Sequence, residues 1–363
     1  MSRHWQLQSP PGILPELFVR RIDERQRWNE IVRGFPHGAL EQGWEWGEVL
    51  RASWARPYRC AVFNGRHCLA AVSILQWRLP ALGASLLYAP RGPLIDPEEP
   101  AAVATLVDHL RRVSSWAGAI MCRVGPAVAG HRPDIHDLLI AQAFRKLPDR
   151  WTIWNSPTIV MWSSLAGEEE DVWRHLSAPR RHAIQLAEIQ EMEVAPPRSR
   201  DELAAFSRLL GERGSGEKLP LRRLRHHAAV CSVYGAMRPP VFFEIARDRG
   251  TVVGGLLGVQ LGTKAYLLYC AVDRDARRSA LSLTPESLLY WRFIRWAKQR
   301  GCDSIDWGGS PMSSPPGEAD PGLGATCLTY IGYYDLVLRP GLYAVFRAAE
   351  RRLGPSLWRL RSA

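Results

Sequence analysis

The sequence predicts an α/β protein made of two similar halves, because one pattern of strands and a helix occurs twice along the chain. The first copy reads CLAAVSILQ and SLLYAPRGPLID, then a helical stretch over residues 101–116 and AIMCRVGP. The second copy reads TVVGGLLGVQ and AYLLYCAVDRD, then a helical stretch over residues 285–300 and SIDWGGSP. Three landmarks keep offsets of 181, 183 and 184 residues: Tyr88 to Tyr269, Gly125 to Gly308, and Ala70 to Gly254. So constant a spacing indicates a duplicated unit with a cleft between the two copies.

The composition is that of a folded protein. At 363 residues the chain has room for two domains, each large enough to bury its own core. Hydrophobic residues make up 46% and charged residues 23%, and no apolar run approaches the ~20 residues that cross a bilayer. The opening MSRHWQLQSPPG has no apolar signal core, and the seven cysteines form neither a CxxC pair nor a Cys/His cluster. We therefore expect a cytoplasmic protein that uses no metal and no other cofactor.

The net charge of +11 favours anionic partners, such as nucleic acid, acidic lipid or a phosphorylated substrate. A second explanation is a genome rich in arginine codons, because nearly all the basic residues are arginines. The last segment, residues 346–363, is basic and amphipathic at helical spacing. A helix there either packs on the core or touches an anionic membrane surface.

In the first half we expect a polar, irregular opening and then a helix over residues 42–52. Strands follow near 58–63 and 68–76, joined by the turn signal Asn64-Gly65. The SLLYAPRG strand, the helix over 101–116 and the AIMCRVGP strand complete an alternation that predicts an α/β sheet. Residues 126–157 are expected to cross between the halves.

The second half opens with a basic helix in SAPRRHAIQLAEIQEMEV, followed by a helix over residues 201–210 and a charged loop over 211–223. A three-stranded meander runs from 242 to 272. The next helix is marked by Thr284 as N-cap, Pro285 in its first turn and Gly301 as C-cap.

The segment 310–324 is rich in Pro, Gly and Ser and is expected to be a loop. The strand that follows lacks a partner in the second half. The predicted domains are therefore 1–155, completed by a returning segment 325–345, then 156–322, with a C-terminal helix over 346–363.

Six motifs of the chain resemble, in order, the landmarks of the Fem aminoacyltransferases. They are QGWEWGEVL, YAPRGPLID, APRRHAIQLAE, GGLLGV with YLLYCAVD, LTPESLLYW with WAKQRGCDSIDWGG, and GYYDLVLRPGLY. A meander followed by a strand, loop and helix is also the core of the GNAT acyltransferase fold, and this chain has it twice. The resemblance implies two tandem GNAT-like domains with mixed central sheets and a cleft between them, without the long helical hairpin insertion of larger members.

The Fem family moves an amino acid from aminoacyl-tRNA to the side-chain amine of a peptidoglycan precursor and so lengthens the interpeptide bridge. The resemblance therefore implies an aminoacyltransferase whose donor is aminoacyl-tRNA. Its acceptor would be a lipid-linked or nucleotide-linked precursor, reached in the cytoplasm near the inner face of the membrane. No metal and no covalent enzyme intermediate are implied.

The YAPRGPLID segment supplies the first candidates. Asp96 stands where the family has an acidic residue at the site, and a carboxylate can orient or deprotonate the attacking amine. Asp96 before Pro97 is also a common turn residue. Arg91 can hold a phosphate bidentately or bridge loop carbonyls, and Tyr88 is either a ring lining the cleft or a half-buried strand tyrosine.

Further candidates lie in the second half. Arg180 and Arg181 begin a helix and form either a phosphate-binding patch for tRNA or a solvated basic face. Tyr269 ends a central strand where the GNAT fold separates two strands to admit its acyl donor, and core packing is the alternative. Four residues at the end of the neighbouring strand allow a ligand to approach the backbone or simply form a turn: Trp307, Gly308, Gly309 and Ser310.

Two departures from the family and one missing feature leave other functions open. Lysines of the family are replaced by Leu50 and by a residue near Asp320. These replacements leave open an enzyme that uses another amine acceptor, or a non-catalytic tRNA- or membrane-associated relative. The loop DRDARRSALSLTPE has none of the glycines with which GNAT enzymes hold the coenzyme A pyrophosphate. This disfavours acyl-CoA, although an N-acyltransferase of polysaccharide or natural-product metabolism that uses acyl-CoA or an acyl carrier remains the alternative enzyme.

Overall fold

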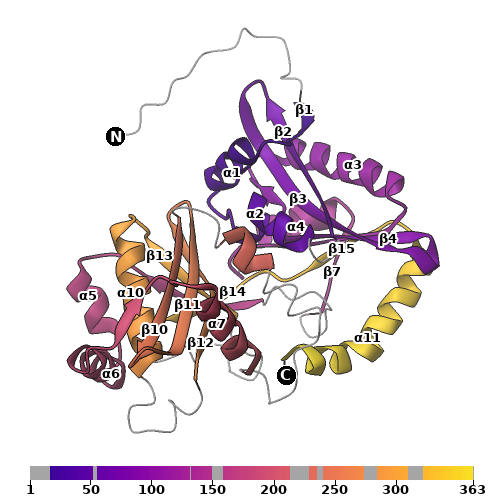
Figure 1. Cartoon of the computed structure of the whole chain (residues 1–363). Helices are drawn as coiled ribbons and strands as arrows, with labels where there is room; N and C mark the ends of the chain where they lie inside the picture. The colour runs from indigo at the N-terminus through magenta and orange to yellow at the C-terminus, as the bar shows by residue number, and fades with distance from the viewer. Residues whose placement is uncertain are drawn as a thin grey trace, which may run out of the picture.

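A computed structural model of the chain describes residues 17–51, 55–130, 132–148, 158–212, 229–234, 240–273, 284–309 and 322–362. Two mixed β-sheets lie side by side, each with helices against it (Figure 1). No helix among the described residues is both long enough and apolar enough to span a membrane.

The first sheet has the strand order β1-β2-β3-β4-β6-β15-β7, with β5 paired to β3. Its strands are β1 (Leu17–Arg21), β2 (Arg56–Asn64), β3 (His67–Leu79), β4 (Ala84–Arg91), β5 (Leu94–Ile95), β6 (Ala119–Pro126), β7 (Phe144–Lys146) and β15 (Tyr334–Val337). Its helical segments are α1 (Arg25–Gly34), η1 (Leu40–Gln42), α2 (Trp44–Arg51), η2 (Pro80–Leu82), α3 (Pro100–Trp116), α4 (Pro133–Ala141) and α11 (Pro340–Ser362).

The second sheet has the order β14-β8-β13-β12-β11-β10-β9. Its strands are β8 (Ile159–Ser164), β9 (Glu193–Ala195), β10 (Val241–Asp248), β11 (Thr251–Leu261), β12 (Lys264–Val272), β13 (Ser304–Gly309) and β14 (Thr326–Thr329). The helices around it are α5 (Glu169–His175), α6 (Ala178–Ile189), α7 (Arg200–Glu212) and α10 (Thr284–Gln299).

The two sheets repeat one topology, and one strand crosses between them. In the first sheet β15 pairs antiparallel with β6, and in the second sheet β8 pairs antiparallel with β13 at the corresponding place. Along the chain β8 precedes the rest of the second sheet, whereas β15 follows it. The second sheet is therefore continuous in sequence from β8 to β14, and the first sheet is completed by β15 from beyond the second.

Three expectations from the sequence need correction. The opening is not irregular throughout, because residues 17–21 form β1 on the edge of the first sheet and residues 25–34 form α1. The segment expected to cross between the halves contains α4 and β7, and β7 pairs with β15 in the first sheet. The segment expected to return from residue 325 first makes β14, which pairs with β8 in the second sheet, and only β15 joins the first sheet.

Each sheet buries a helix that carries apolar residues every three or four positions. Leu106 and Leu110 of α3 are fully buried against the first sheet, and Leu289 and Phe293 of α10 against the second. Gly258 of β11 lies under Phe293 so closely that an added Cβ would stand 2.3 Å from the ring. This contact explains a glycine in the middle of a buried strand.

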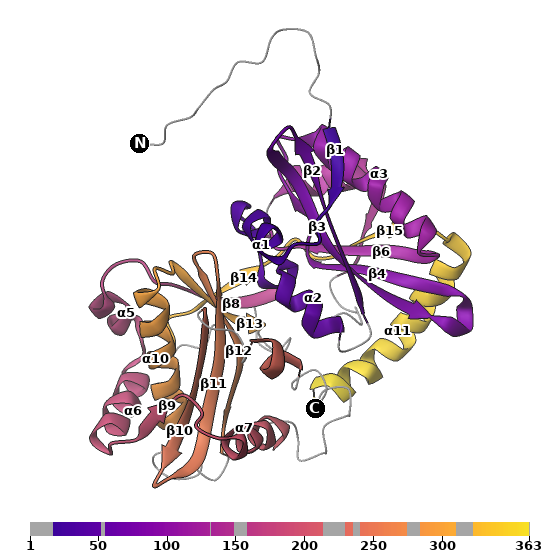
Figure 2. The same cartoon turned by 45° about the horizontal axis from the view of Figure 1, so that its top comes forward.

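The face of the second sheet that α10 leaves free is turned toward the first domain. Leu40 and Val49 of the first domain are buried in one cluster with Leu257, Val259 and Tyr266 of the second. Figure 2 shows α1 and α2 between the two sheets. The functional groups described next lie along this junction.

Candidate functional site

The YAPRGPLID segment runs through β4 and β5 and is held by side chains from residues 37–42. Gln42, fully buried, donates from Nε2 to the carbonyl oxygens of Pro90 (2.6 Å) and Ser73 (3.2 Å), and its Oε1 accepts from the Ser73 amide (2.8 Å). His37 accepts from the backbone amide of Ile95 through Nε2 at 3.1 Å. The loop is thus fixed at both ends by buried hydrogen bonds, which suits a site that must keep its geometry.

Arg91 ends β4 and points into the junction between the domains. Its side chain is 4% exposed, its Nε lies 3.5 Å from Oε1 of Glu41, and its guanidinium lies 4.2 Å from the centre of the Tyr330 ring. Its backbone φ of 54° is a strained conformation for a residue with a side chain. Arg91 was one of the residues expected at the site, and the structure surrounds it with groups from three separate segments.

Asp306 of β13 reaches the same junction from the second domain. Its neighbour Trp307 packs on Tyr290 and Phe293 of α10, and because side chains alternate along a strand, Asp306 lies on the opposite face, toward the first domain. Its Oδ1 accepts a hydrogen bond of 2.7 Å from the amide of Gly308. We call Glu41, Arg91, Asp306 and Tyr330 the interdomain cluster.

The charges of the interdomain cluster shift one another's pKa. Burial, and then the charge of Glu41, raise the pKa of Asp306 to about 6, although Arg91 opposes the shift. Burial alone would lower the pKa of Arg91, but Glu41, Tyr330 and Asp306 outweigh it and raise that pKa. The cluster therefore holds a carboxyl that exchanges its proton near neutral pH beside a permanent cation.

The strand that carries Asp306, β13, separates from its neighbour β12 at this point. β12 and β13 run parallel and are paired only over Lys264–Tyr266 with Ser304–Asp306. The equivalent strands of the first sheet, β4 and β6, stay paired from Ser85 with Ala119 to Arg91 with Pro126. Only the second sheet thus shows the separated strands expected for an acyl donor, and Asp306 is the last paired residue before they separate.

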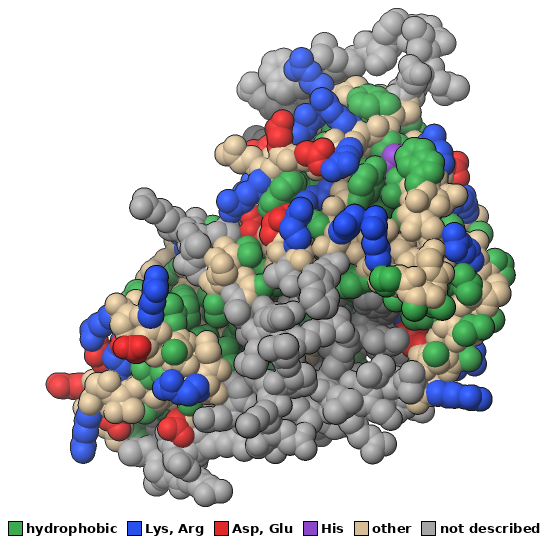
Figure 3. Space-filling model, turned by 45° about the vertical axis from the view of Figure 1, so that its right-hand side comes forward, with side chains coloured by type: hydrophobic (Ala, Val, Ile, Leu, Met, Phe, Trp, Pro, Cys, Tyr) green, Lys and Arg blue, Asp and Glu red, His purple; other side chains and the backbone are tan. Residues whose placement is uncertain are grey.

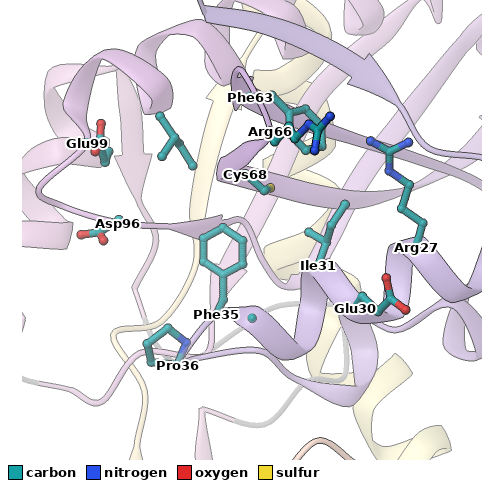
Figure 4. A pocket seen from close by; sticks show the side chains of 12 residues that line it. Arg27, Glu30, Ile31, Phe35, Pro36, Phe63, Arg66, Cys68, Asp96 and Glu99 are labelled. Atoms are coloured by element: carbon teal, nitrogen blue, oxygen red, sulfur yellow. The ribbon is translucent and has the colours of Figure 1, made fainter. Parts of the chain in front are cut away.

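Asp96 lies in a neighbouring pocket of the first domain and not in the interdomain cluster. It is exposed directly after β5, and its Oδ1 accepts from the Glu98 amide at 2.9 Å, as in a turn. It lines a cavity of about 470 Å³. Figure 4 shows Phe35 in the middle of this cavity, with Asp96 and Glu99 on one side and Arg27 on the other.

His37 lies within reach of charges from both domains. Burial, then the charges of Lys264 and Arg132, lower its pKa to about 4, and Asp96 acts in the opposite direction. His37 is therefore neutral at neutral pH, and it senses both Lys264 of the second domain and Asp96 of the first. Lys264 in turn donates to the Pro36 carbonyl at 3.3 Å.

The other expected substrate-binding residues are mostly in the core. Tyr88 is 4% exposed and packs with Trp77, Leu147 and Tyr333. Trp307 is 5% exposed and donates from Nε1 to Ser163 Oγ at 2.8 Å.

Three more of these residues lie along the separated strands. Tyr269 is half-buried and packs against the cluster around Phe206 of α7. Gly308 has a φ of 87°, which glycine adopts without strain, and Gly309 pairs with Val160 of β8. Ser310 lies outside the described residues.

The two arginines expected to bind tRNA phosphates are held by protein groups. Arg180 is 7% exposed, lies over the Tyr290 ring at 5.4 Å and donates to Ser287 Oγ at 3.1 Å. Arg181 donates to the carbonyl oxygens of Arg174 and Leu176, each at 3.0 Å. These contacts tie α6 to α5 and α10.

Sequence reasoning missed Glu41, Asp306 and Tyr330, although all three lie inside the motifs that carry the family resemblance or next to them. Alternation along SIDWGG gave a usable signal, because the indole and the carboxylate must point to opposite faces. Leu50 lies at the end of α2, and Asp320 lies outside the described residues. No group of three or more His, Cys, Asp or Glu side chains in the described part of the chain could hold a metal ion.

The chain is similar to known acyltransferases in sequence and in structure. Residues 174–317 match the family of acetyltransferase (GNAT) domains. The lipid II:glycine glycyltransferase of Staphylococcus haemolyticus is 19% identical over 405 residues, which cover 90% of this chain and 95% of that protein.

Two solved structures share the whole architecture. The crystal structure of FemX matches with a TM-score of 0.78 at 15% identity, over 90% of this chain and 99% of FemX. A tandem GNAT protein from the clavulanic acid biosynthesis pathway matches with a TM-score of 0.53 at 11% identity, over 89% and 99% of the two chains. The expected tandem GNAT fold and the Fem resemblance are confirmed, and residues 174–317 match a GNAT acetyltransferase domain.

Proposed function

We propose that this protein is an aminoacyltransferase that moves an amino acid from aminoacyl-tRNA to an amine of a peptidoglycan precursor or a similar acceptor. One observation carries the proposal. Strands β12 and β13 of the second domain separate directly beside Asp306. The carboxyl of Asp306 has a raised pKa and faces Arg91 of the first domain. Donor, base and cation therefore converge on one junction between the domains.

The donor would enter between β12 and β13. Beyond Tyr266 and Asp306 the two strands no longer pair with each other, and the carbonyl of an aminoacyl ester would bind in this opening. The likeness to the lipid II:glycine glycyltransferase supports an aminoacyl group as the cargo. The absence of glycine from DRDARRSALSLTPE supports a carrier other than coenzyme A.

The acceptor would come from the cavity that Asp96 lines. Asp96, Glu99 and Glu30 place three carboxylates around it, which attract a protonated amine. Arg27 and Arg66 line the same cavity and suit the anionic part of a precursor. In this arrangement Asp96 orients the amine, as the family resemblance implies.

A protonated amine first releases one proton to water, and the neutral amine then gives a second proton to the base, which delivers it to the leaving group. In the proposal the amine nitrogen attacks the ester carbonyl and Asp306 takes a proton from it. Arg91 stabilises the negative charge that develops on the carbonyl oxygen. The bond from that carbon to the ribose oxygen then breaks, and Asp306 gives the proton to this oxygen, which leaves as a hydroxyl. The amide therefore forms without a covalent enzyme intermediate.

The experiment that tests the proposal measures transfer of label from tRNA charged with a radiolabelled amino-acid pool into small molecules of a cell extract. Treatment of the charged tRNA with RNase is the control. We expect an RNase-sensitive product that is strongly reduced by Asp306→Asn and Asp96→Asn. Asp108→Asn, at an exposed ion pair on α3, is the matched control and should keep full activity. Transfer that survives RNase, or full activity of both site variants, would refute the proposal.

One rival is favoured by a specific observation, the match to a tandem GNAT protein from the clavulanic acid biosynthesis pathway. In that case the second domain would use acyl-CoA to acylate an amine. Isothermal titration with free coenzyme A separates the two functions. Tight binding supports the acyl-CoA enzyme, whereas no binding together with tRNA-dependent transfer supports the aminoacyltransferase.

A further inference from the structure

One end of the first domain exposes large hydrophobic side chains from three separate segments. Trp116 at the end of α3 is 83% exposed, Val345 on α11 is 68% exposed, and Leu82 in η2 is 57% exposed. Soluble proteins seldom leave several such side chains in water on one side, and where they do the side usually binds something. Arg78, Arg112 and Arg339 are also exposed on these segments, and we call these six residues the docking surface.

The three segments are neighbours in space. A Cβ built on Gly118, two residues after Trp116, would lie 3.4 Å from Nη2 of Arg339 and 3.7 Å from the carbonyl oxygen of Gly83. The amide of Arg339 also donates to the Ile120 carbonyl at 3.1 Å. Figures 1 and 2 agree, since both place the tip of the β3–β4 hairpin, the end of α3 and the start of α11 at the right-hand side.

The charge of the docking surface has one sign. The three stretches that build it, residues 74–95, 109–126 and 336–349, contain no Asp or Glu. The acidic residues that flank the last stretch, Asp335 and Glu350, are buried and bonded to Arg123. Figure 3 brings this side forward and shows arginine and hydrophobic side chains interspersed, with few acidic ones.

We propose that the docking surface binds an anionic phospholipid bilayer. An indole and aliphatic side chains that project from three different segments suit a flat, soft apolar layer. Tryptophan is favoured at the boundary between lipid headgroups and acyl chains. The surrounding arginines would bind the lipid phosphates, and each basic residue near an anionic membrane strengthens binding roughly fivefold.

This inference rests on the proposed function in one respect, because it specifies how the enzyme would reach a lipid-linked acceptor. The first domain would then be the membrane-facing one, with α3 and α11 beside the bilayer. The surface itself is defined by exposure and charge alone, so binding to lipid can be tested without any substrate.

The test is co-sedimentation of the full chain with vesicles of phosphatidylglycerol and phosphatidylcholine, compared with vesicles of phosphatidylcholine alone. We expect binding only to the anionic vesicles, weakened by added salt. The triple variant Leu82→Ser, Trp116→Ala, Val345→Ser should lose at least tenfold in affinity. Arg112→Gln with Arg339→Gln should lose on the order of tenfold, and this loss should shrink as salt is raised.

Matched controls come from the second domain. Ile189→Ser removes a hydrophobic side chain that is 78% exposed on α6, and Arg200→Gln with Arg208→Gln removes two exposed charges on α7. Both should bind vesicles within twofold of the parent chain. If the triple variant fails to fold, Trp116→Ala alone should still weaken binding about threefold.

Three results would overturn the inference: no binding to anionic vesicles, equal losses in the control variants, or a triple variant that alters self-association while vesicle binding is unchanged. Transfer to a water-soluble acceptor separates this failure from failure of the proposed function. That reaction should be unaffected by the triple variant whether or not the surface binds lipid.

Discussion

At Asp306 the same raised pKa affects both the stability of the fold and the proposed role as a base. A carboxyl whose pKa is raised by burial and by Glu41 destabilises the folded state once it ionises. The cost is absent below the ordinary pKa of 3.8, grows as pH rises, and is fully present above a folded-state pKa of about 6. The shift corresponds to roughly 3 kcal/mol at most.

Asp306→Asn should therefore make the protein more stable and less active. Above pH 6 we expect the free energy of unfolding to rise by about 1–3 kcal/mol, because the neutral amide avoids the cost of the buried charge. Near pH 4 the gain should vanish, since the native carboxyl is then protonated too. Urea unfolding at the two pH values measures this difference. Equal gains in the free energy of unfolding at the two pH values would show that the ionised carboxylate does not destabilise the fold.

Arg91 should set the pH at which the site becomes active. If Asp306 is the base, turnover of the parent chain rises with pH through an apparent pKa near 6. Arg91→Gln removes the cation that favours the ionised carboxylate, so the rising limb should move to higher pH as the maximum rate falls. A pH profile of kcat for the parent chain and the variant measures both effects. A limb that stays in place would exclude Asp306 as the titrating group.

The sequence could identify Arg91 and Asp96 because they lie in a motif that carries the family resemblance. Alternation along SIDWGG places Asp306 on the face opposite Trp307, but the sequence does not show what Asp306 faces, because Glu41 and Arg91 come from the other domain. Arg180 looked like part of a solvent-exposed basic patch. Only packing shows that its guanidinium lies over Tyr290.

At the scale of elements, periodicity predicted the long, strongly patterned parts of the fold. The meander β10–β12 and the helices α3 and α10 lie where the sequence placed them, because alternation and helical spacing are local signals. β1 and α1 escaped notice because they bury little: in α1 only Trp28 and Val32 are buried. Such elements are stabilised by tertiary contacts that a local pattern does not record.

The helix α11 is attached to the first sheet by a buried ionic network. Arg123 donates to Asp335 at 2.7 and 2.9 Å and to Glu350 at 2.6 and 3.0 Å, and Tyr343 donates to Asp335 at 3.0 Å. Arg123, Asp335 and Glu350 are almost fully buried. Charges removed from water in this way depend on every partner being present.

Glu350→Gln should therefore destabilise the protein by about 3 kcal/mol, because Arg123 loses one of its two carboxylates while remaining buried. Asp134→Asn, which weakens the exposed pair with Arg132, is the matched control and should cost less than 1 kcal/mol. Guanidinium unfolding of both variants measures the contrast. Similar small effects would mean that α11 is held by Leu342 and Phe346 and not by the charges.

At the scale of the whole molecule, the return of β15 to the first sheet and the apolar junction between the sheets join the two domains into one unit. Tandem domains joined by a linker unfold separately unless their interface is large and apolar. Here the first sheet lacks β15 unless the chain beyond the second sheet is present, whereas the strands of the second sheet all lie between residues 159 and 329. The sequence indicated a duplication and a returning strand, but the place of that strand between β6 and β7 depends on tertiary pairing that no local signal encodes.

The two domains should consequently lose their structure together. Leu40→Ala, in the apolar junction with Leu257, Val259 and Tyr266, should lower the free energy of unfolding by about 2–4 kcal/mol. Because β15 and the apolar junction join the sheets, hydrogen exchange in peptides from β3 and β11 should accelerate by the same factor, although Leu40 belongs to the first domain. Faster exchange in β3 alone would show that the second sheet holds together without the first, and that β15 and the junction do not couple them.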